Sequence, residues 1–307
     1  MPETKRPLQL CITAEGAMYP MDQQHRLLEV ARLAEDLGVD WLDTTEHMLM
    51  GDGALTSGHG WEPHHLEQPQ PEPLVQLAAF AGATTRIKLL SAIVIAPLYP
   101  AGLLAKAVAS LHAISRGRFV LGVSTSWHKD EYDTLRVPFE ERGAVLDEVI
   151  GACRALWETS PASFHGKYEN FDGMHCSPRP APGERIQVWF GGKITPRSIR
   201  RIVELGDGWM PFGGLRMSVD EKRDAVQMLR ERYRQAGRDP ASLNVCDEVA
   251  AINGDVERSL AQVPEIAETG SNLIRCNIRR YIKGPDDVLP VLERVVKAWE
   301  PYRTMLV

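Results

Sequence analysis

The sequence predicts a (β/α)8 TIM barrel, an α/β fold in which eight parallel strands alternate with helices. Short β-type runs alternate with longer helical patterns along the whole chain, and eight such units can be counted. No change of composition divides the 307 residues, and barrels of this length form one domain. We therefore expect a single domain over residues 1–307, with a doubly wound open sheet as the alternative fold.

The first four strands are predicted from continuous apolar runs, and the helices between them from apolar residues recurring at helical spacing. Strands are expected at 8–13, 41–45, 87–95 and 119–123, and helices at 22–37, 73–83 and 101–114. Gly38 marks the end of the first helix, and the segment SRGR supplies the turn before the fourth strand. A loop rich in Gly, His and Pro forms an insertion at 48–71.

The second half of the chain repeats the same order of elements. It is expected to contain strands at 186–190, 207–210, 243–249 and 273–277, and helices at 138–157, 196–205, 219–236, 256–269 and 286–302. A second insertion, rich in Pro and Gly, is expected at 160–184. Because the parallel strands of a barrel end at one rim, the residues that follow each strand are the candidates for chemistry.

The bulk composition is that of a soluble globular protein, with 44% hydrophobic and 25% charged residues. A formal net charge of −6 gives no indication of a nucleic-acid partner. No apolar run reaches the length of a membrane helix, and the N-terminus lacks the apolar region of a signal peptide. The five cysteines are scattered and form no CxxC pair, which argues against a disulfide framework or a zinc site and favours the cytoplasm.

Two strand ends carry side chains suited to proton transfer and to binding a flat ligand. Glu46 and His47 follow the second strand, and side chains of these types exchange protons near neutral pH. Ser124, Thr125 and Trp127 follow the fourth strand, where small polar groups can contact a ligand and the indole can stack on it. The alternatives are a hydrogen-bonded pair at a loop start and a helix-capping turn.

The end of the fifth strand, WFGGKITPRS, indicates an anion site. Gly191 and Gly192 allow close approach, and the helix that starts at Pro196 presents free N–H groups. Lys193 and Arg197 add positive charge where a phosphate could lie. A plain glycine turn before a capped helix is the alternative.

Other strand ends and one loop carry weaker signals. Ser91 and Ala92 interrupt the large residues of the third strand, which indicates either close approach of a ligand or plain core packing. Trp209 could line the mouth or fill the barrel, and filling is the expectation. The histidine-rich loop GHGWEPHHLE is expected to act as a lid that faces the substrate, in preference to a metal site. Further candidates for contacting a phosphate or a carboxylate are Arg275, Arg279 and Arg280.

Three segments together resemble the bacterial luciferase-like monooxygenase superfamily. They are LGVSTSWHKDEYDTLRVPFEERGAVLDE (121–148), FHGKYENFDGMHCSPRP (164–180) and VWFGGKITPRSIRRIVELGDGWMP (188–211). The run PEPLVQLAAFAGATTRIKLLSAIVIAPLYP (71–100) is similar as well. The resemblance is strong over residues 8–211, is specific as a set of motifs, and is closest to the branch that uses the deazaflavin coenzyme F420.

This resemblance implies a barrel, often dimeric, with a flat flavin or deazaflavin across its mouth. A non-proline cis peptide is implied at Ser91–Ala92, behind the ring. The Glu46–His47 pair is implied to lie next to the ring. The implied contacts to the ring or its ribityl chain are Val123, Ser124, Thr125 and Trp127. The implied contacts to the phosphate and the start of the acidic tail are Gly191, Gly192, Lys193 and Arg197.

The leading hypothesis is an F420-dependent oxidoreductase that transfers a hydride between the coenzyme and a small organic substrate. His47 is its expected proton donor or acceptor, and Glu46 is the expected orienter of His47. In the related sugar-phosphate dehydrogenase branch an acidic glutamate stands where this chain has Trp127. That difference disfavours glucose-6-phosphate and favours an apolar or aromatic substrate beside Trp127 and Trp61.

Two other functions stay open. One is a two-component flavin monooxygenase that uses FMNH2 and O2, and the other is a flavin-binding protein without turnover. The expected partners are a small-molecule substrate, a second copy of the chain in a homodimer, and a separate reductase that regenerates the cofactor.

Overall fold

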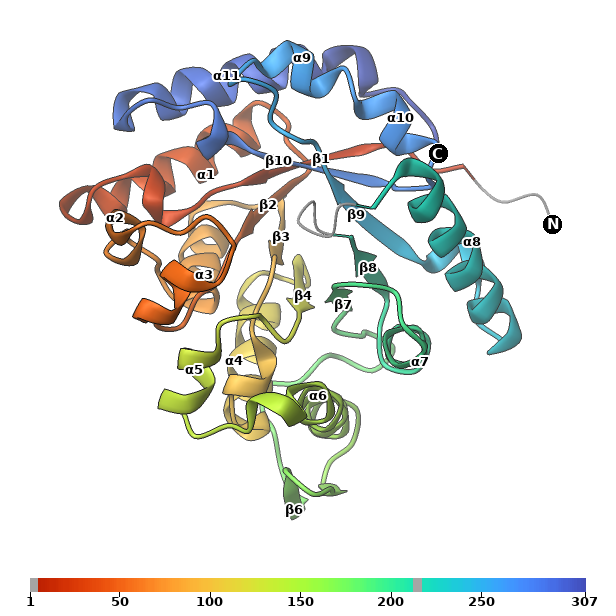
Figure 1. Cartoon of the computed structure of the whole chain (residues 1–307). Helices are drawn as coiled ribbons and strands as arrows, with labels where there is room; N and C mark the ends of the chain where they lie inside the picture. Colours follow the sequence, from red (N-terminus) through yellow and green to blue (C-terminus); the bar gives the residue numbers. More distant parts are fainter. Residues whose placement is uncertain (1–4, 212–216) are drawn as a thin grey trace.

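The computed structural model describes residues 5–211 and 217–307, and its eight parallel strands close into a barrel (Figure 1). In chain order the barrel strands are β1 (Gln9–Thr13), β2 (Trp41–Thr44), β3 (Lys88–Ser91), β4 (Phe119–Val123), β7 (Val188–Gly191), β8 (Gly208–Met210), β9 (Asn244–Glu248) and β10 (Leu273–Asn277). Strand β1 pairs with both β2 and β10. This closure confirms the predicted barrel and excludes the open sheet.

Helices surround the barrel. They are α1 (Leu27–Asp36), α3 (Pro73–Ala83), α4 (Ala101–Ile114), α6 (Arg142–Glu158), α7 (Pro196–Glu204), α8 (Val219–Gln235), α9 (Val256–Leu260), α10 (Val263–Ala267) and α11 (Val288–Trp299). The bounds of α3 and α4 match the predicted ranges. The predicted helix at 256–269 is instead two helices, because Pro264 has no N–H to continue the hydrogen-bond ladder from α9.

Each predicted insertion carries short elements of its own. The first contains a 3-10 helix, Asp52–Thr56, and α2 (Pro63–Leu66). The second is an antiparallel hairpin of β5 (Ala162–His165) and β6 (Asn170–Met174), which packs on α6 at the lower edge of Figure 1. A short helix that the sequence pattern did not predict, α5 (Lys129–Thr134), follows β4.

The inside of the barrel is packed with side chains. Trp41 and Trp189 lie there with ring centroids 5.2 Å apart, in one cluster with Met210. Trp209 was expected in this interior, and that prediction is wrong. Its side chain belongs to the larger cluster between the strands and the helices, because successive side chains of a strand point to opposite faces.

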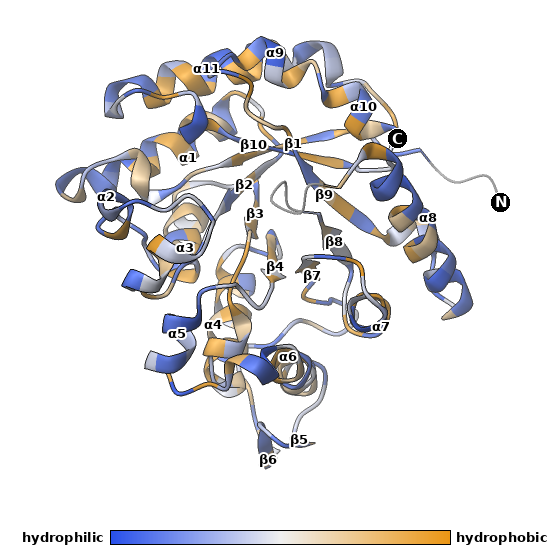
Figure 2. Ribbon diagram, in the orientation of Figure 1, coloured by the Kyte–Doolittle hydropathy of each residue, from blue (hydrophilic) through white to orange (hydrophobic). Residues whose placement is uncertain are grey.

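The surrounding helices bury one face each. On α8 the buried residues are Ala225, Val226, Leu229 and Tyr233, which recur at helical spacing. Much of the remainder of α8 is hydrophilic (Figure 2). Over residues 5–211 and 217–307, no helix combines the length and the apolar character needed to cross a membrane.

The third strand ends earlier than predicted. A non-proline cis peptide follows β3 at Ala92–Ile93, one bond beyond the implied Ser91–Ala92 position. Ser91 stays in the sheet because its hydroxyl donates to the Gly122 carbonyl (3.0 Å) and accepts from the Gly122 N–H (2.9 Å). The Ala92 N–H also still donates to the Thr44 carbonyl, at 2.8 Å. A Cβ on Gly122 would lie 2.0 Å from the Ser91 carbonyl oxygen, so only glycine fits there.

Candidate active site

His47, at the rim of the barrel, faces a buried carboxylate. It follows β2, and its Nδ1 lies 3.4 Å from Oε2 of Glu131 on α5. Glu131 is fully buried, and its Oε1 accepts hydrogen bonds from the backbone N–H groups of Met48 and Leu49. These two N–H groups hold the carboxylate in place, and the carboxylate in turn orients the imidazole.

The sequence predicted that Glu46 orients His47, but the Glu46 carboxylate contacts two other residues. Its Oε2 accepts from the N–H of Ile95, and its Oε1 accepts from the hydroxyl of Tyr99. Neighbouring residues of an extended chain point their side chains in opposite directions, which separates Glu46 from His47. Glu131 therefore takes the orienting position. The sequence pattern missed it, because Glu131 stands in a charged run, KDEYD, that is typical of an exposed turn.

Burial raises the pKa of Glu46 from its ordinary value of 4.5 to about 7. The hydrogen bonds from Ile95 and Tyr99 oppose this shift, whereas the negative charges of Glu72 and Glu131 add to it. The Tyr99 hydroxyl also lies 3.0 Å from Oε1 of Glu72. Glu46 is therefore a carboxyl group that can gain or lose a proton near neutral pH.

Aromatic rings surround His47. Trp61 and Trp127 meet its imidazole nearly at right angles, with centroid distances of 5.3 and 5.4 Å. The two indoles are 6.2 Å apart, and His59 packs on Trp127 at 4.3 Å. The structure thus brings the two predicted substrate-pocket tryptophans together. Within the described part of the chain, no group of three or more His, Cys, Asp or Glu side chains is arranged to hold a metal ion.

A cavity of about 250 Å³ opens at this rim. Its lining includes Glu46, His47, Trp61, Arg279 and Arg280, together with residues that follow β1 and residues of the first insertion. Side chains from the ends of β1, β2 and β10 therefore converge on one space. This is the rim at which parallel barrels carry their chemistry.

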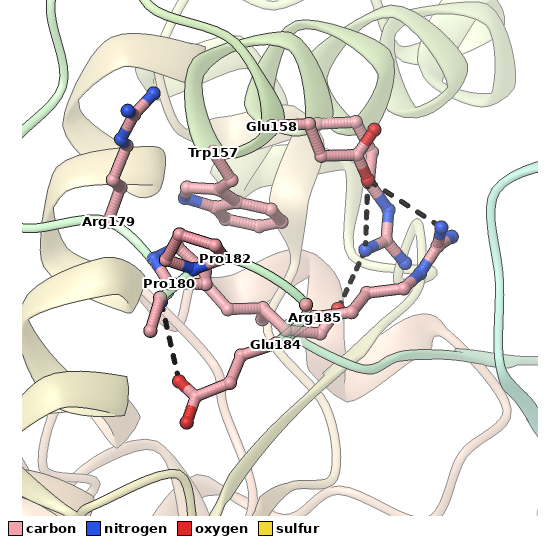
Figure 3. A pocket seen from close by; sticks show the side chains of 11 residues that line it. Trp157, Glu158, Arg179, Pro180, Pro182, Glu184 and Arg185 are labelled. Atoms are coloured by element: carbon pink, nitrogen blue, oxygen red, sulfur yellow. Dashed lines mark hydrogen bonds and ion pairs between the residues drawn. The ribbon is translucent and has the colours of Figure 1, made fainter.

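A second pocket, of about 290 Å³, lies at the opposite end of the strands, because its residues come from the end of α6 and the segment that leads into β7 (Figure 3). Glu158 there lies 3.6 Å from Arg185 and 3.7 Å from Arg154. Asp207 also pairs with both arginines, at 2.8 Å from Arg154 and 3.4 Å from Arg185, so two carboxylates balance these two guanidinium groups. Because the pocket lies away from the rim and its charged side chains are paired, we interpret it as a structural ion-pair cluster.

The three arginines near the end of β10 differ in their surroundings. Arg275 is buried inside the barrel, where it donates to Asp43 at 2.6 and 3.2 Å and to Glu248 at 3.0 Å. Its guanidinium is engaged in these hydrogen bonds inside the barrel and is not available to a ligand. Arg279 and Arg280 line the mouth cavity, so these two remain at the predicted place.

The end of β4 is tied to the end of β7. The Ser124 hydroxyl donates to the Gly191 carbonyl at 3.0 Å, and the Thr125 carbonyl accepts from the hydroxyl of Tyr132. Val123 is fully buried within β4. The polar groups of this loop are thus partly used by the protein itself, and they place the residue after β4 beside Gly191, the last residue of β7.

The predicted anion site is partly occupied by protein contacts. Gly192 has a φ of +126°, a conformation that favours glycine. Thr195 caps α7 by accepting from the N–H of the third helical residue. The Nε of Arg197 donates to Asp147 at 2.9 Å, so its charge is shared with α6. Lys193 is exposed, which leaves it and the glycine backbone as the more accessible groups of this site.

Curated relatives are similar over most of the chain. An uncharacterised protein of Mycobacterium tuberculosis, Rv0953c, is 30% identical over 213 residues, which cover 68% of this chain and 74% of that protein. The pyrimidine monooxygenase RutA of Rhizobium rhizogenes is 24% identical over 340 aligned positions, covering 91% of this chain and 90% of RutA.

Solved structures share the fold. The monooxygenase RslO1 from Streptomyces bottropensis matches with a TM-score of 0.76 at 19% identity, covering 96% of this chain and 99% of its own. An F420-dependent secondary alcohol dehydrogenase matches with a TM-score of 0.71 at 17% identity, covering 95% and 99%. The model of the luciferase-like monooxygenase family matches residues 8–266, and the chain therefore belongs to this family.

Proposed function

We propose that the protein is an F420-dependent oxidoreductase that transfers a hydride between the deazaflavin coenzyme and a small apolar or aromatic organic substrate. The observation that carries the proposal is the His47–Glu131 pair, because His47 lines the mouth cavity and packs against Trp61 and Trp127. An imidazole that is oriented by a buried carboxylate suits proton transfer at a substrate while a hydride moves. Similarity of the sequence motifs to the deazaflavin branch supports F420 as the cofactor.

The residues present at the rim fit a flat cofactor. Ala92 places a small side chain where β3 ends, and Gly191 and Gly192 leave the end of β7 without side chains. A Cβ added to Gly192 would extend into the space beside the Ser124 hydroxyl, 4.0 Å away. A planar ring system and its polyol chain can approach such a surface closely. Lys193 offers a cation for the phosphate.

When bound, F420 supplies the ring carbon that gives or takes the hydride. His47 is the group that donates or accepts the proton. Its Nδ1 faces Glu131, which leaves Nε2 as the nitrogen for a substrate oxygen. The Glu131 carboxylate stabilises the imidazolium form while His47 holds the proton. Trp61 and Trp127 hold an apolar substrate and keep water away from the imidazole.

Binding of the cofactor tests this proposal directly. The purified protein is titrated with F420 and, separately, with FMN, and binding is followed by fluorescence. We expect F420 to bind, and we expect His47→Ala to keep that binding while losing turnover. Tight binding of FMN without binding of F420 would overturn the choice of cofactor.

A second candidate function is a two-component monooxygenase that uses FMNH2 and O2. The observation in its favour is that relatives named as monooxygenases, RutA and RslO1, cover most of this chain. Oxygen consumption in the presence of FMN and a flavin reductase separates this function from F420-dependent hydride transfer. A flavin-binding protein without turnover would bind the cofactor and show no activity in wild type, so that His47→Ala would change no assay.

We also propose that the protein acts as a homodimer and that a separate reductase regenerates the reduced cofactor. Both expectations are supported by the resemblance of the sequence to its family. Light scattering on the purified protein measures the oligomeric state.

A further inference from the structure

The hydroxyl of Tyr99 lies between two carboxyl groups. It contacts Oε1 of Glu46, and it lies 3.0 Å from Oε1 of Glu72. A phenol carries a single proton, so it can donate to only one of the two. The second contact is a hydrogen bond only if the other carboxyl group is protonated and donates to the phenol oxygen. Two full hydrogen bonds at the phenol oxygen would therefore require one additional proton, shared among these three side chains.

The two carboxyl groups lie at different depths. Glu46 is only 7% exposed and lines the mouth cavity together with His47. Glu72 is half-buried at the start of α3, where its Oε2 accepts from the N–H of Val75 at 2.6 Å. Tyr99 is half-buried between them. The three side chains thus form a continuous path from the cavity toward the surface of the molecule.

We propose that Glu46, Tyr99 and Glu72 form a proton relay that joins the mouth cavity to the surrounding water. The proposal rests on the proposed function, which needs a proton to enter or leave the cavity in each turnover. In one outward transfer, the O–H bond of the Glu46 carboxyl breaks and a new O–H bond forms at the Tyr99 oxygen. Tyr99 passes its own proton to the Glu72 carboxylate, which releases it to water. Inward transfer is the reverse, and no oxidant or reductant is required.

The alternative is that Tyr99 only fixes the loop after β3. In that case removing the hydroxyl would still change the pKa of Glu46, because a hydrogen bond is lost, but proton transfer during turnover would not depend on Tyr99. The groups that act on Glu46 are the Ile95 N–H, Tyr99, Glu72 and Glu131. Two of them have opposite effects on the pKa of Glu46, because the Tyr99 hydrogen bond lowers it and the negative charge of Glu72 raises it. The titration therefore tests whether the three side chains are coupled, and the rate of turnover separates the relay from a purely structural Tyr99.

The first experiment needs no cofactor. Infrared difference spectra are recorded as a function of pH on the full-length protein, and the protonated carboxyl that disappears in Glu46→Gln is assigned to Glu46. We expect its midpoint to move to higher pH in Tyr99→Phe and to lower pH in Glu72→Gln. Tyr168→Phe is the matched control, because the Tyr168 hydroxyl donates to Glu141 away from the barrel mouth. A midpoint that neither Tyr99→Phe nor Glu72→Gln moves would overturn the relay.

The second experiment measures turnover with F420 bound. We expect Tyr99→Phe to lower kcat by about tenfold in dilute buffer, with unchanged affinity for F420. Small weak acids added at high concentration should restore much of the lost rate, because they carry the proton in place of the relay. A purely structural role of Tyr99 would show no such rescue, and its absence would count against the relay.

The two proposals fail in different ways. A wild-type protein that neither binds nor uses F420 contradicts the proposed function. The infrared titration does not depend on that result, so it still decides whether the protonation of Glu46 is coupled to Tyr99 and Glu72, as the relay requires.

Discussion

The Nδ1 atom of His47 lies 3.4 Å from Oε2 of Glu131, a residue 84 positions further along the chain. The contact links the end of β2 to the helix that follows β4. The position of the Glu131 carboxylate is fixed, because it also accepts hydrogen bonds from the backbone N–H groups of Met48 and Leu49, immediately after His47. The buried negative charge thus acts directly on the candidate proton donor of the site.

Replacing Glu131 with Gln keeps the size of the side chain and removes its charge. We expect kcat to fall by about a hundredfold, since the imidazolium of His47 loses its stabilising carboxylate. Steady-state kinetics and an F420 titration should show this fall with little change in cofactor affinity. The control is Asp133→Asn on the same helix, which only breaks an exposed ion pair with Lys129. Equal kcat in Glu131→Gln and wild type would contradict the assigned role.

Trp127 is expected to act on substrate binding. Trp127→Ala removes one of the two indoles beside His47, and we expect the KM for an apolar substrate to rise by about tenfold. Trp127→Phe keeps an aromatic wall and should show a smaller increase. Measurement of KM and kcat for the three proteins tests this order. A KM that is the same in all three would place the substrate elsewhere.

Gly122 is expected to be intolerant of any side chain. The Cβ of Gly122→Ala would meet the Ser91 carbonyl oxygen at 2.0 Å and the Met210 Cε at 2.8 Å, so the free energy of unfolding should fall by about 3 kcal/mol. Gly82→Ala is the matched control. Its Cβ meets nothing within 4 Å on α3, and alanine in a helix should stabilise the protein by about 0.5–1 kcal/mol. Denaturant unfolding of both variants measures the contrast.

The stability of the protein should depend on the ionisation of Glu46. Folding raises the pKa of this carboxyl from 4.5 to about 7, so the folded state holds a proton that the unfolded chain releases. The resulting stabilisation is fully present below pH 4.5 and is lost as the pH rises through about 7. Its size is up to about 3 kcal/mol.

Glu46→Gln isolates this contribution, because glutamine does not titrate. The free energy of unfolding of wild type and Glu46→Gln is compared at about pH 5 and about pH 8. Wild type should lose more stability than the variant over this interval. Parallel pH dependence in the two proteins would show that Glu46 ionises with an ordinary pKa.

The elements that the sequence predicted well are those whose signals are local. Helix α3 begins with Pro73 in its first turn, and α4 begins directly after Pro100. In both cases a proline in the local sequence indicates where the helix starts. The length of β3 was overestimated, because the apolar run of residues 87–95 continues past the point where the backbone leaves the sheet. Periodicity detects burial and does not detect a change of backbone direction.

The candidate site was predicted only in part. His47 and Trp127 could be placed at the rim, because both follow a strand of the barrel. Trp61 lies in the first insertion, and its place beside His47 follows from the fold of that loop. Tyr99 and Glu72 were missed, since neither directly follows a strand.

The sequence by itself predicted the barrel, with an open sheet as the alternative, and the chain positions that reach its rim, because apolar periodicity and strand ends are properties of short segments. Only the tertiary structure decided that Glu131 meets His47 and that Glu46 meets Tyr99. The physical reason is that an acidic residue has the same local pattern whether it is exposed or buried. Its burial, and hence its charge and its partner, depends on which loops pack over the rim.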